Sequence, residues 1–439
     1  MTSAVPDPPG TRLELPPAHD VAAAEAFVRH HLGDLVDGEV VASHRFRGGQ
    51  MAADAALAAL DVSGYAATRN EVWPEERRGA SAVSPYVRHG LLQLPLLWEA
   101  VAEAPARDRG KYRDELLWQE YARHLYARVG IGLGEGLRHR LAGTPWRGDG
   151  DGDGDGDGDA GQAATAAAAS VWDPDMACLA TTTRELVEDG YLVNQTRMWL
   201  ASHWAVREGV DWRDGEEVFF RHLLDGSRAA NRAGWQWTVG TATGRPYGFS
   251  RWQVTKRAPG LCDSCPLADD CPIEDWPEDP PLPAAEEPPG LRHDLDPERT
   301  AGPRRPEVTS RPEAVWLTAE SLGDDDPALV GHPDLPAVFV FDAPLLTRLQ
   351  LSGKRLVFLT EALADLAARR EVQVHLGDPV EVLAGRALAT TFAPVPGWRR
   401  RSAALEIVAL HPWPWLRRPH GRSAASFSAW RKAVDRSVR

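Results

Sequence analysis

The sequence predicts a protein of two parts, an all-α domain followed by a smaller α/β domain. Over residues 21–60, 111–130 and 181–206, apolar residues recur at three- and four-residue intervals, which indicates helices. After a Pro- and acid-rich stretch, the pattern changes to short apolar runs that alternate with a helical segment, as in a parallel sheet covered by helices. We therefore expect a multidomain α and α/β architecture.

In the first part, residues 1–20 are expected to form a flexible lead and residues 21–273 the all-α domain. The clearest element is the amphipathic stretch 111–130. Residues 148–160 alternate Asp and Gly but lack the closing Glu of an EF-hand loop, so we interpret them as a solvated insertion. The compact Cys-rich segment 262–271 ends this domain.

The second part begins after a Pro-rich, acidic linker over 274–312 and extends over residues 313–435. It is predicted to contain three buried strands, at 314–318, 337–341 and 372–376, and a helix over 355–370 before the third strand.

Composition excludes several classes of protein. The chain is 43% hydrophobic and has no apolar run of 18 residues, so no membrane span is expected. Its first residues lack an export signal, which predicts a cytoplasmic location. The net charge of −14 argues against general nucleic-acid binding but permits a local basic groove. Such a groove would favour action on DNA, and its candidates are Arg197, Arg228, Arg232, Arg251 and Lys256.

The four cysteines indicate a metal site rather than disulfides. Cys262, Cys265 and Cys271 form a compact ligand spacing, and Cys178 supplies a fourth thiolate from further upstream. Four thiolates suit either an iron–sulfur (4Fe–4S) cluster, which we favour, or a structural zinc ion. The remaining alternative is four unrelated buried cysteines.

The stretch 223–237 mixes polar groups with large aromatic surfaces. Asp225, Asn231 and Gln236 need hydrogen-bond partners, and Trp235 and Trp237 lie two positions apart. This mixture favours a pocket for a planar cofactor with polar edges over an ordinary aromatic core.

Five motifs in this order resemble the DNA photolyase/cryptochrome family: GASAVSPYVRHG (79–90), ELLWQEYARHL (115–125), GYLVNQTRMWLAS (190–202), DWRDGEEVFFRHLLDG (211–226) and AANRAGWQW (229–237). The resemblance implies an all-α FAD-binding domain followed by a small Rossmann-like antenna-type domain. The antenna-like motifs, 315–329 and 338–342, come second here, and SFSAWRKAV (426–434) comes last. The resemblance therefore implies a circular permutation. Which antenna chromophore is bound, if any, is not implied.

The resemblance places the following residues at the FAD: Tyr65, Arg69, Ser81, Val83, Ser84, Gln119, Asn194, Arg197, Asp225, Ser227 and Asn231. Arg197 and Asp225 match an ion pair beside the flavin ring, and Asn231 matches the residue that faces N5. A nearby cation favours the anionic form of a reduced flavin.

For the substrate, damaged DNA, Trp118 and Trp237 match two tryptophans that wedge a flipped-out pyrimidine dimer. Glu115, Asn194 and Met198 match its polar and apolar contacts. Trp235 and Trp212 match the inner and middle members of an electron-transfer chain. Two candidates for the outer member are Trp172 and Trp204.

Several positions depart from the family pattern. Gln119 stands where many relatives carry Arg, Tyr191 replaces a Trp, and Ser227 replaces an Asp near the adenine side. Val193 stands where (6-4) photolyases carry a catalytic His, which favours repair of cyclobutane dimers. The arrangement of the distant Cys178 with the compact group Cys262, Cys265 and Cys271 resembles that of the iron–sulfur photolyases and of some DNA glycosylases.

Three functions are open: light-driven dimer repair, a cryptochrome-like photoreceptor or flavin redox protein without repair activity, and a structural iron–sulfur/FAD protein. The clamp of Glu115, Trp118 and Trp237 favours the first. The acidic net charge, Gln119 and Ser227 favour the second.

Overall fold

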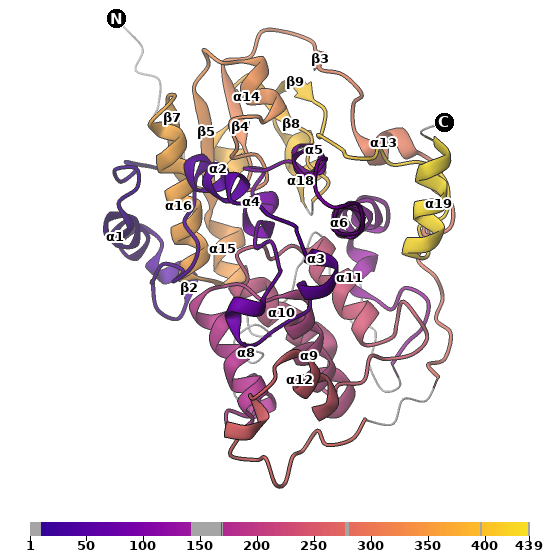
Figure 1. Cartoon of the computed structure of the whole chain (residues 1–439). Coiled ribbons are helices and arrows are strands. Elements are labelled where there is room, and N and C mark those ends of the chain that lie inside the picture. Colours follow the sequence, from indigo (N-terminus) through magenta and orange to yellow (C-terminus); the bar gives the residue numbers. More distant parts are fainter. Residues whose placement is uncertain (1–9, 142–167, 169, 277–280, 396, 438–439) are drawn as a thin grey trace, which may run out of the picture.

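The computed structural model describes residues 10–141, 168, 170–276, 281–395 and 397–437, and it has a helical half beside a half built on a sheet (Figure 1). The insertion expected over 148–160 lies outside these residues. The principal helices of the helical half are α2 (Gln50–Ala58), α3 (Tyr65–Thr68), α4 (Ser84–Arg88), α5 (Leu94–Ala100), α6 (Ala106–Val129), α8 (Ala177–Glu188), α9 (Asn194–Ser202), α10 (Trp212–His222), α11 (Arg228–Thr238) and α12 (Arg251–Arg257). Across the described ranges, no helix combines the length and apolarity needed to cross a membrane.

The other half is built on a seven-stranded sheet in the order β1-β7-β5-β4-β8-β9-β3. Its strands are β1 (Thr11–Leu13), β3 (Glu307–Val308), β4 (Ala314–Leu317), β5 (Ala337–Asp342), β7 (Val372–Gly377), β8 (Leu388–Thr391) and β9 (Ile407–His411). The five inner strands run parallel, and β1 and β3 are antiparallel edges. The predicted strands at 314–318, 337–341 and 372–376 are confirmed. The apolar side chains of β4 and β5 are buried on both faces of the sheet, whereas only Val374 and His375 of β7 are buried.

The expectation of a flexible lead over residues 1–20 is wrong for its second half. Residues Thr11–Leu13 form β1, which pairs antiparallel with β7. The pairing covers an otherwise open sheet edge and buries Leu13. Asp20 then caps α1 (Val21–His31), which packs against α16 (Gly353–Ala367). The first elements of the chain therefore belong to the sheet half.

The proposed linker over 274–312 also carries regular structure. It contains α13 (Pro297–Ala301) and β3, and Glu307 pairs with Leu410 of β9. A further isolated bridge joins Ala284 to His139. Its backbone groups thus find partners on both halves, so this stretch is packed onto the molecule along part of its length.

Helix α16 joins the two halves. Every residue from Gly353 to Leu366 is buried, because the helix lies between the sheet and the helical half. Its polar residues serve as contacts: the Glu361 carboxylate accepts from Gly48 N at 2.8 Å, and Asp365 accepts from Gln50 N at 2.7 Å.

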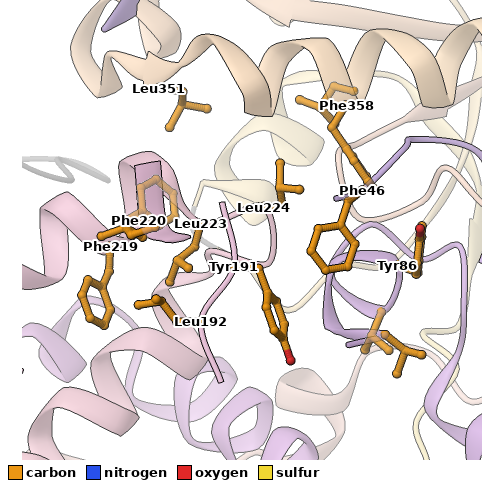
Figure 2. Packing of buried hydrophobic residues seen from close by; sticks show 14 of the residues in the cluster. Phe46, Tyr86, Tyr191, Leu192, Phe219, Phe220, Leu223, Leu224, Leu351 and Phe358 are labelled. Carbon is orange, nitrogen blue, oxygen red and sulfur yellow. The ribbon is translucent and has the colours of Figure 1, made fainter. Parts of the chain in front are cut away.

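Figure 2 shows the apolar core at this junction, where Phe358 and Leu351 lie near side chains of the helical half. Tyr86 lies 6.1 Å from Phe358 and 6.4 Å from Phe46, measured between ring centroids. One continuous hydrophobic cluster includes buried residues of both halves.

The last helix, α19 (Phe427–Ser437), returns to the helical half and packs against α6 (Figure 1). Trp430 is fully buried there and donates from Nε1 to His124 Nδ1 at 2.8 Å.

Candidate flavin and substrate cavity

A cavity of about 720 Å³ opens in the helical half. Sites for cofactors and other small ligands commonly have volumes in this range. The structure brings 15 of the predicted site residues to its wall: Tyr65, Arg69, Ser81, Val83, Ser84, Glu115, Trp118, Gln119, Asn194, Arg197, Met198, Asp225, Asn231, Trp235 and Trp237.

Most of these side chains come from three helices. On α6, Glu115, Trp118 and Gln119 have the three- and four-residue spacing that places side chains on one helix face. The same spacing holds for Asn194, Arg197 and Met198, which open α9. On α11, Asn231, Trp235 and Trp237 reach the cavity.

The floor of the cavity is a charged network around Asp225. Arg197 Nη2 donates to Asp225 Oδ2 at 2.7 Å, and Ser84 Oγ donates to the same oxygen at 2.5 Å. Arg197 also donates from Nε to Leu192 O at 3.0 Å. Because Asp225 is 6% exposed, its charge depends on these partners.

Asp225 Oδ1, Asn231 Nδ2 and Trp235 Nε1 are buried at the cavity wall without a hydrogen-bond partner in the protein. Buried polar groups are normally paired, so this combination of acceptor and donors fits a ligand with a polar edge. The flavin ring of FAD has such an edge. The residues present therefore fit the cofactor.

The opposite wall holds a second charged cluster. Glu115 Oε1 lies 2.9 Å from Lys111 Nζ and 3.3 Å from Arg69 Nε, so its carboxylate is held between two cations. Burial, and then the charge of Glu115, raises the pKa of Tyr65, whose phenol therefore stays protonated.

Two tryptophans stand at the mouth of the cavity. Trp118 is 37% exposed and Trp237 is 39% exposed. Trp237 lies 5.8 Å from the Tyr247 ring. The mouth thus offers two aromatic surfaces in front of a polar floor.

Comparison with known proteins shows which family this arrangement resembles. Residues 112–256 match the family model for the FAD binding domain of DNA photolyase. The chain is 31% identical over 193 residues to a deoxyribodipyrimidine photo-lyase of Thermus thermophilus. The aligned region is 43% of this chain and 42% of that protein. This region of the chain is similar to the FAD-binding domain of the DNA photolyase family. The match to a FAD-binding domain supports FAD as the cofactor.

Other relatives in the family are more distant. A deoxyribodipyrimidine photo-lyase of Synechococcus is 28% identical over 187 residues, which is 40% of this chain and 35% of the relative. Among solved structures, a class III photolyase from Agrobacterium tumefaciens aligns with a TM-score of 0.35 and 23% identity over 43% of this chain and 37% of that one. A Synechocystis cryptochrome aligns with a TM-score of 0.40 and 21% identity over 51% and 46%. The chain spans less than half the length of the curated photo-lyases it matches.

Two residues carried over from the photolyase/cryptochrome pattern do not reach the cavity wall. Ser227 caps α11, where its Oγ accepts from Ala230 N at 3.1 Å. Trp212 is buried at the start of α10 and is absent from the cavity lining.

An aromatic row leads from the cavity into the core. The ring of Trp235 lies 5.1 Å from Phe219, which lies 6.1 Å from Trp172. Trp172 in turn lies 5.1 Å from Trp204, and both are buried. Gly215 allows this packing, because a Cβ there would come within 2.2 Å of the Trp235 ring.

One wall of the cavity could not be predicted from the sequence. Residues 425–428, at the start of α19, line it together with α6 and α11. The SFSAWRKAV motif identified the segment, but nothing in its spacing placed it against Trp118, some 300 positions earlier in the chain.

The expected basic groove is largely neutralised by ion pairs. Carboxylates contact four of its five cations: Arg197 with Asp225, Arg228 with Glu216 and Glu217, Arg232 with Glu216, and Arg251 with Glu274. Lys256 Nζ lies over the Trp252 ring at 4.6 Å.

The four cysteines line one small cavity beside α8 and α12, with apolar neighbours such as Leu261 and Ile273. Ala177 N donates to Cys265 Sγ at 3.4 Å, a contact suited to a thiolate. Burial, and then the other three cysteines, raises the pKa of Cys178 to about 12. Within the described residues, no three Cys, His, Asp or Glu side chains are gathered closely enough to hold a metal ion.

Proposed function

We propose that this protein is a light-driven DNA-repair flavoprotein that splits cyclobutane pyrimidine dimers. The observation that carries the proposal is one cavity with an Arg197–Asp225 floor and two exposed tryptophans at its mouth. The chemistry that FAD supplies when bound is light-driven transfer of one electron to the dimer and its return after the ring has split. The redox balance is therefore closed without an external oxidant.

The floor residues would bind and orient the flavin. The Arg197 guanidinium lies partly buried beside the cavity, where a cation favours the negatively charged form of a ligand. Asn231 Nδ2 offers a neutral amide donor without a competing partner in the protein. Asp225 Oδ1 supplies a buried acceptor for a ring N–H.

The mouth residues would hold the flipped dimer. Stacking of a base on an aromatic side chain contributes about 1–3 kcal/mol, and Trp118 and Trp237 each expose such a surface. Glu115, held by Lys111 and Arg69, accepts hydrogen bonds from the polar edge of a pyrimidine. Met198 adds an apolar contact.

The deciding experiment is light-driven repair of an oligonucleotide with one thymine dimer, by protein carrying reduced FAD. We expect the wild type to repair the dimer. Trp118→Ala should bind the dimer at least about tenfold more weakly, because one stacking contact is lost. Trp276→Ala, which removes a 54% exposed tryptophan outside the cavity, is the matched control. A wild-type protein that binds FAD but repairs no dimer would refute the proposal.

The second candidate is a cryptochrome-like photoreceptor or flavin redox protein without repair activity. The net charge of −14 and the ion-paired arginines around the cavity favour it, because DNA affinity depends on free positive charge. Light-dependent reduction of bound FAD without affinity for dimer-containing DNA is the result expected of this candidate.

We also propose that the four cysteines bind a 4Fe–4S cluster. The donor set supports this, because Cys178, Cys262, Cys265 and Cys271 line the same apolar cavity. Iron and acid-labile sulfide in anaerobically purified protein would support the cluster, and both should be lost in Cys265→Ser. Zinc in place of iron, or no metal, would contradict it.

Finally, we propose the domain order: a FAD-binding domain over 21–273, a connecting segment over 274–312, and an antenna-like α/β domain over 313–435. The order is that of a circularly permuted family member. The return of α19 to α6 supports it, because this segment resembles the one that enters the flavin domain in relatives. Figure 1 shows β7, the strand with which β1 pairs, and α19 on opposite sides of the molecule.

A further inference from the structure

The last helix of the chain contributes an aromatic ring to the cavity. Phe427 stacks on Trp118 with ring centroids 3.9 Å apart and an interplanar angle of 10°. Both side chains line the cavity. Trp118 is the residue to which the proposed function assigns stacking on a flipped pyrimidine, and one of its two faces is thus already covered by the protein itself.

Phe427 is held in place by contacts around it. Tyr121 Oη donates to Ala424 O at 2.8 Å, just before α19 begins. The Phe427 ring lies 5.8 Å from that of Trp430, at an angle of 28°. Because Trp430 is fully buried and bonded to His124, the ring behind Phe427 is anchored in the core.

These contacts fix the plane of the Trp118 indole. Phe427 covers one face, and Tyr121 meets the ring edge-on at 5.7 Å with an interplanar angle of 81°. An exposed tryptophan on a helix would otherwise sample several rotamers, and ordering it on binding would cost affinity. With one face covered, a ligand has the other face on which to stack.

We infer that Phe427 is a positioning residue for damaged-base binding: it preorganises Trp118 so that its remaining face receives an extrahelical pyrimidine. This inference rests on the proposed function and deepens it. It makes the C-terminal helix part of the substrate site, although the residue does not take part in the electron transfer.

The test compares Phe427→Ala, Phe427→Tyr and Trp118→Ala, each loaded with FAD. Binding is measured to a dimer-containing oligonucleotide and to its undamaged twin. We expect Phe427→Ala to lose about threefold to tenfold in discrimination between them, the range for one aromatic pair. Phe427→Tyr should restore it, and Trp118→Ala should lose more.

Two further readouts separate positioning from a loss of folding. FAD content and the repair rate at saturating DNA should stay unchanged in Phe427→Ala, so that the defect lies in KM and not in kcat. In protein labelled with 5-fluorotryptophan, the fluorine NMR signal of Trp118, assigned by Trp118→Phe, should shift and broaden in Phe427→Ala. Lys432→Ala, at an exposed residue of the same helix outside the cavity lining, should leave the signal in place.

The outcomes are distinguishable. Unchanged or tighter dimer binding by Phe427→Ala, with weak binding by Trp118→Ala, would overturn the inference alone, and tighter binding would show that Phe427 obstructs the site. A wild-type protein that does not distinguish damaged from undamaged DNA would overturn the proposed function and the inference together.

Discussion

Asp225 carries the floor of the cavity, and its two carboxylate oxygens play different parts. Oδ2 accepts hydrogen bonds from Arg197 and Ser84, whereas Oδ1 is buried without a partner in the protein. A carboxylate half-satisfied in this way is costly unless a ligand completes it. The residue is thus organised for a bound molecule rather than for the stability of the protein alone.

Arg197→Ala should weaken retention of FAD. Hydrogen bonds to charged groups contribute about 1.5–3 kcal/mol, so we expect about tenfold to a hundredfold weaker binding. Flavin absorbance per protein after dilution and gel filtration measures it. Arg292→Ala removes an exposed ion pair with Glu287 and serves as the control. Equal flavin retention in the two variants would contradict the assigned role of Arg197.

Trp235 lines the cavity and contacts the ring of Phe219, which leads to Trp172 in the core. We expect Trp235→Phe to slow light-driven reduction of bound FAD strongly in the presence of an external reductant. Trp172→Phe and Trp212→Phe then identify the next carrier, because Trp172 lies on the aromatic row and Trp212 was expected from the family pattern. Normal photoreduction in Trp235→Phe would exclude this exit from the cavity.

At this scale, the sequence predicted most of the cavity and missed one wall. Glu115 and Asn194 could be found because each sits in a short motif whose helical spacing fixes the face it shares with its neighbours, whereas Asp225 lies in a turn and was found through the resemblance of its motif to the family. Ser227 could not be placed, because a serine in that position serves equally as a helix cap. Phe427 escaped because its partner is remote in the chain.

Among the elements, α6 connects the cavity to the end of the chain. One face carries Trp118, and another buries Glu120 against residue 417, whose backbone N–H donates to Glu120 Oε1 at 2.8 Å. Burial raises the pKa of Glu120 to about 7, from an ordinary value of 4.5. The helix therefore has a pH-dependent contact with the segment that precedes α19.

Glu120→Gln should remove a pH dependence of stability. Between pH 4.5 and about 7, the folded protein keeps the Glu120 proton that the unfolded chain releases, so the free energy of unfolding falls as the pH rises. Glutamine is neutral throughout and keeps the acceptor oxygen. The free energy of unfolding of the variant, relative to that of the wild type, should therefore rise by about 2–3 kcal/mol from pH 5 to pH 8. Urea unfolding of wild type and variant at both pH values measures this. An equal change in the free energy of unfolding of the two proteins between these pH values would contradict the prediction.

Helix α16 shows where element prediction succeeds and where it stops. Apolar periodicity predicted a helix over 355–370, and α16 spans Gly353–Ala367. Its Glu361 and Asp365 would be expected on a solvated face, but both are buried as acceptors for backbone N–H groups near residues 48–50. Periodicity identifies a helix but does not show which distant backbone needs its polar side chains.

In the whole molecule, each end of the chain joins the other half. Strand β1 completes the sheet of the C-terminal half, and α19 packs on the helical N-terminal half. The predicted domain boundaries at residues 20 and 274 rested on local composition, which cannot reveal such exchanges. The halves also share the core that contains Phe46 and Phe358 (Figure 2).

Two chains covering residues 1–276 and 281–439 should therefore associate when expressed together. We expect them to copurify in equal amounts and to bind FAD, because β1, α16 and α19 bury apolar surface across the division. Trp430→Ala in the second chain should weaken the association, since truncating a buried Trp costs about 3–5 kcal/mol. Independent, flavin-binding monomers of the first chain would contradict this.

The position of Phe427 also bears on the order of events during synthesis. The ribosome makes α6, α9 and α11 first, and the wall formed by residues 425–428 is made after them. At that stage the helical half has the residues proposed to bind FAD, but the mouth of the cavity is incomplete. On the proposed function, a product truncated just before residue 425 would carry the cofactor yet discriminate damaged DNA poorly.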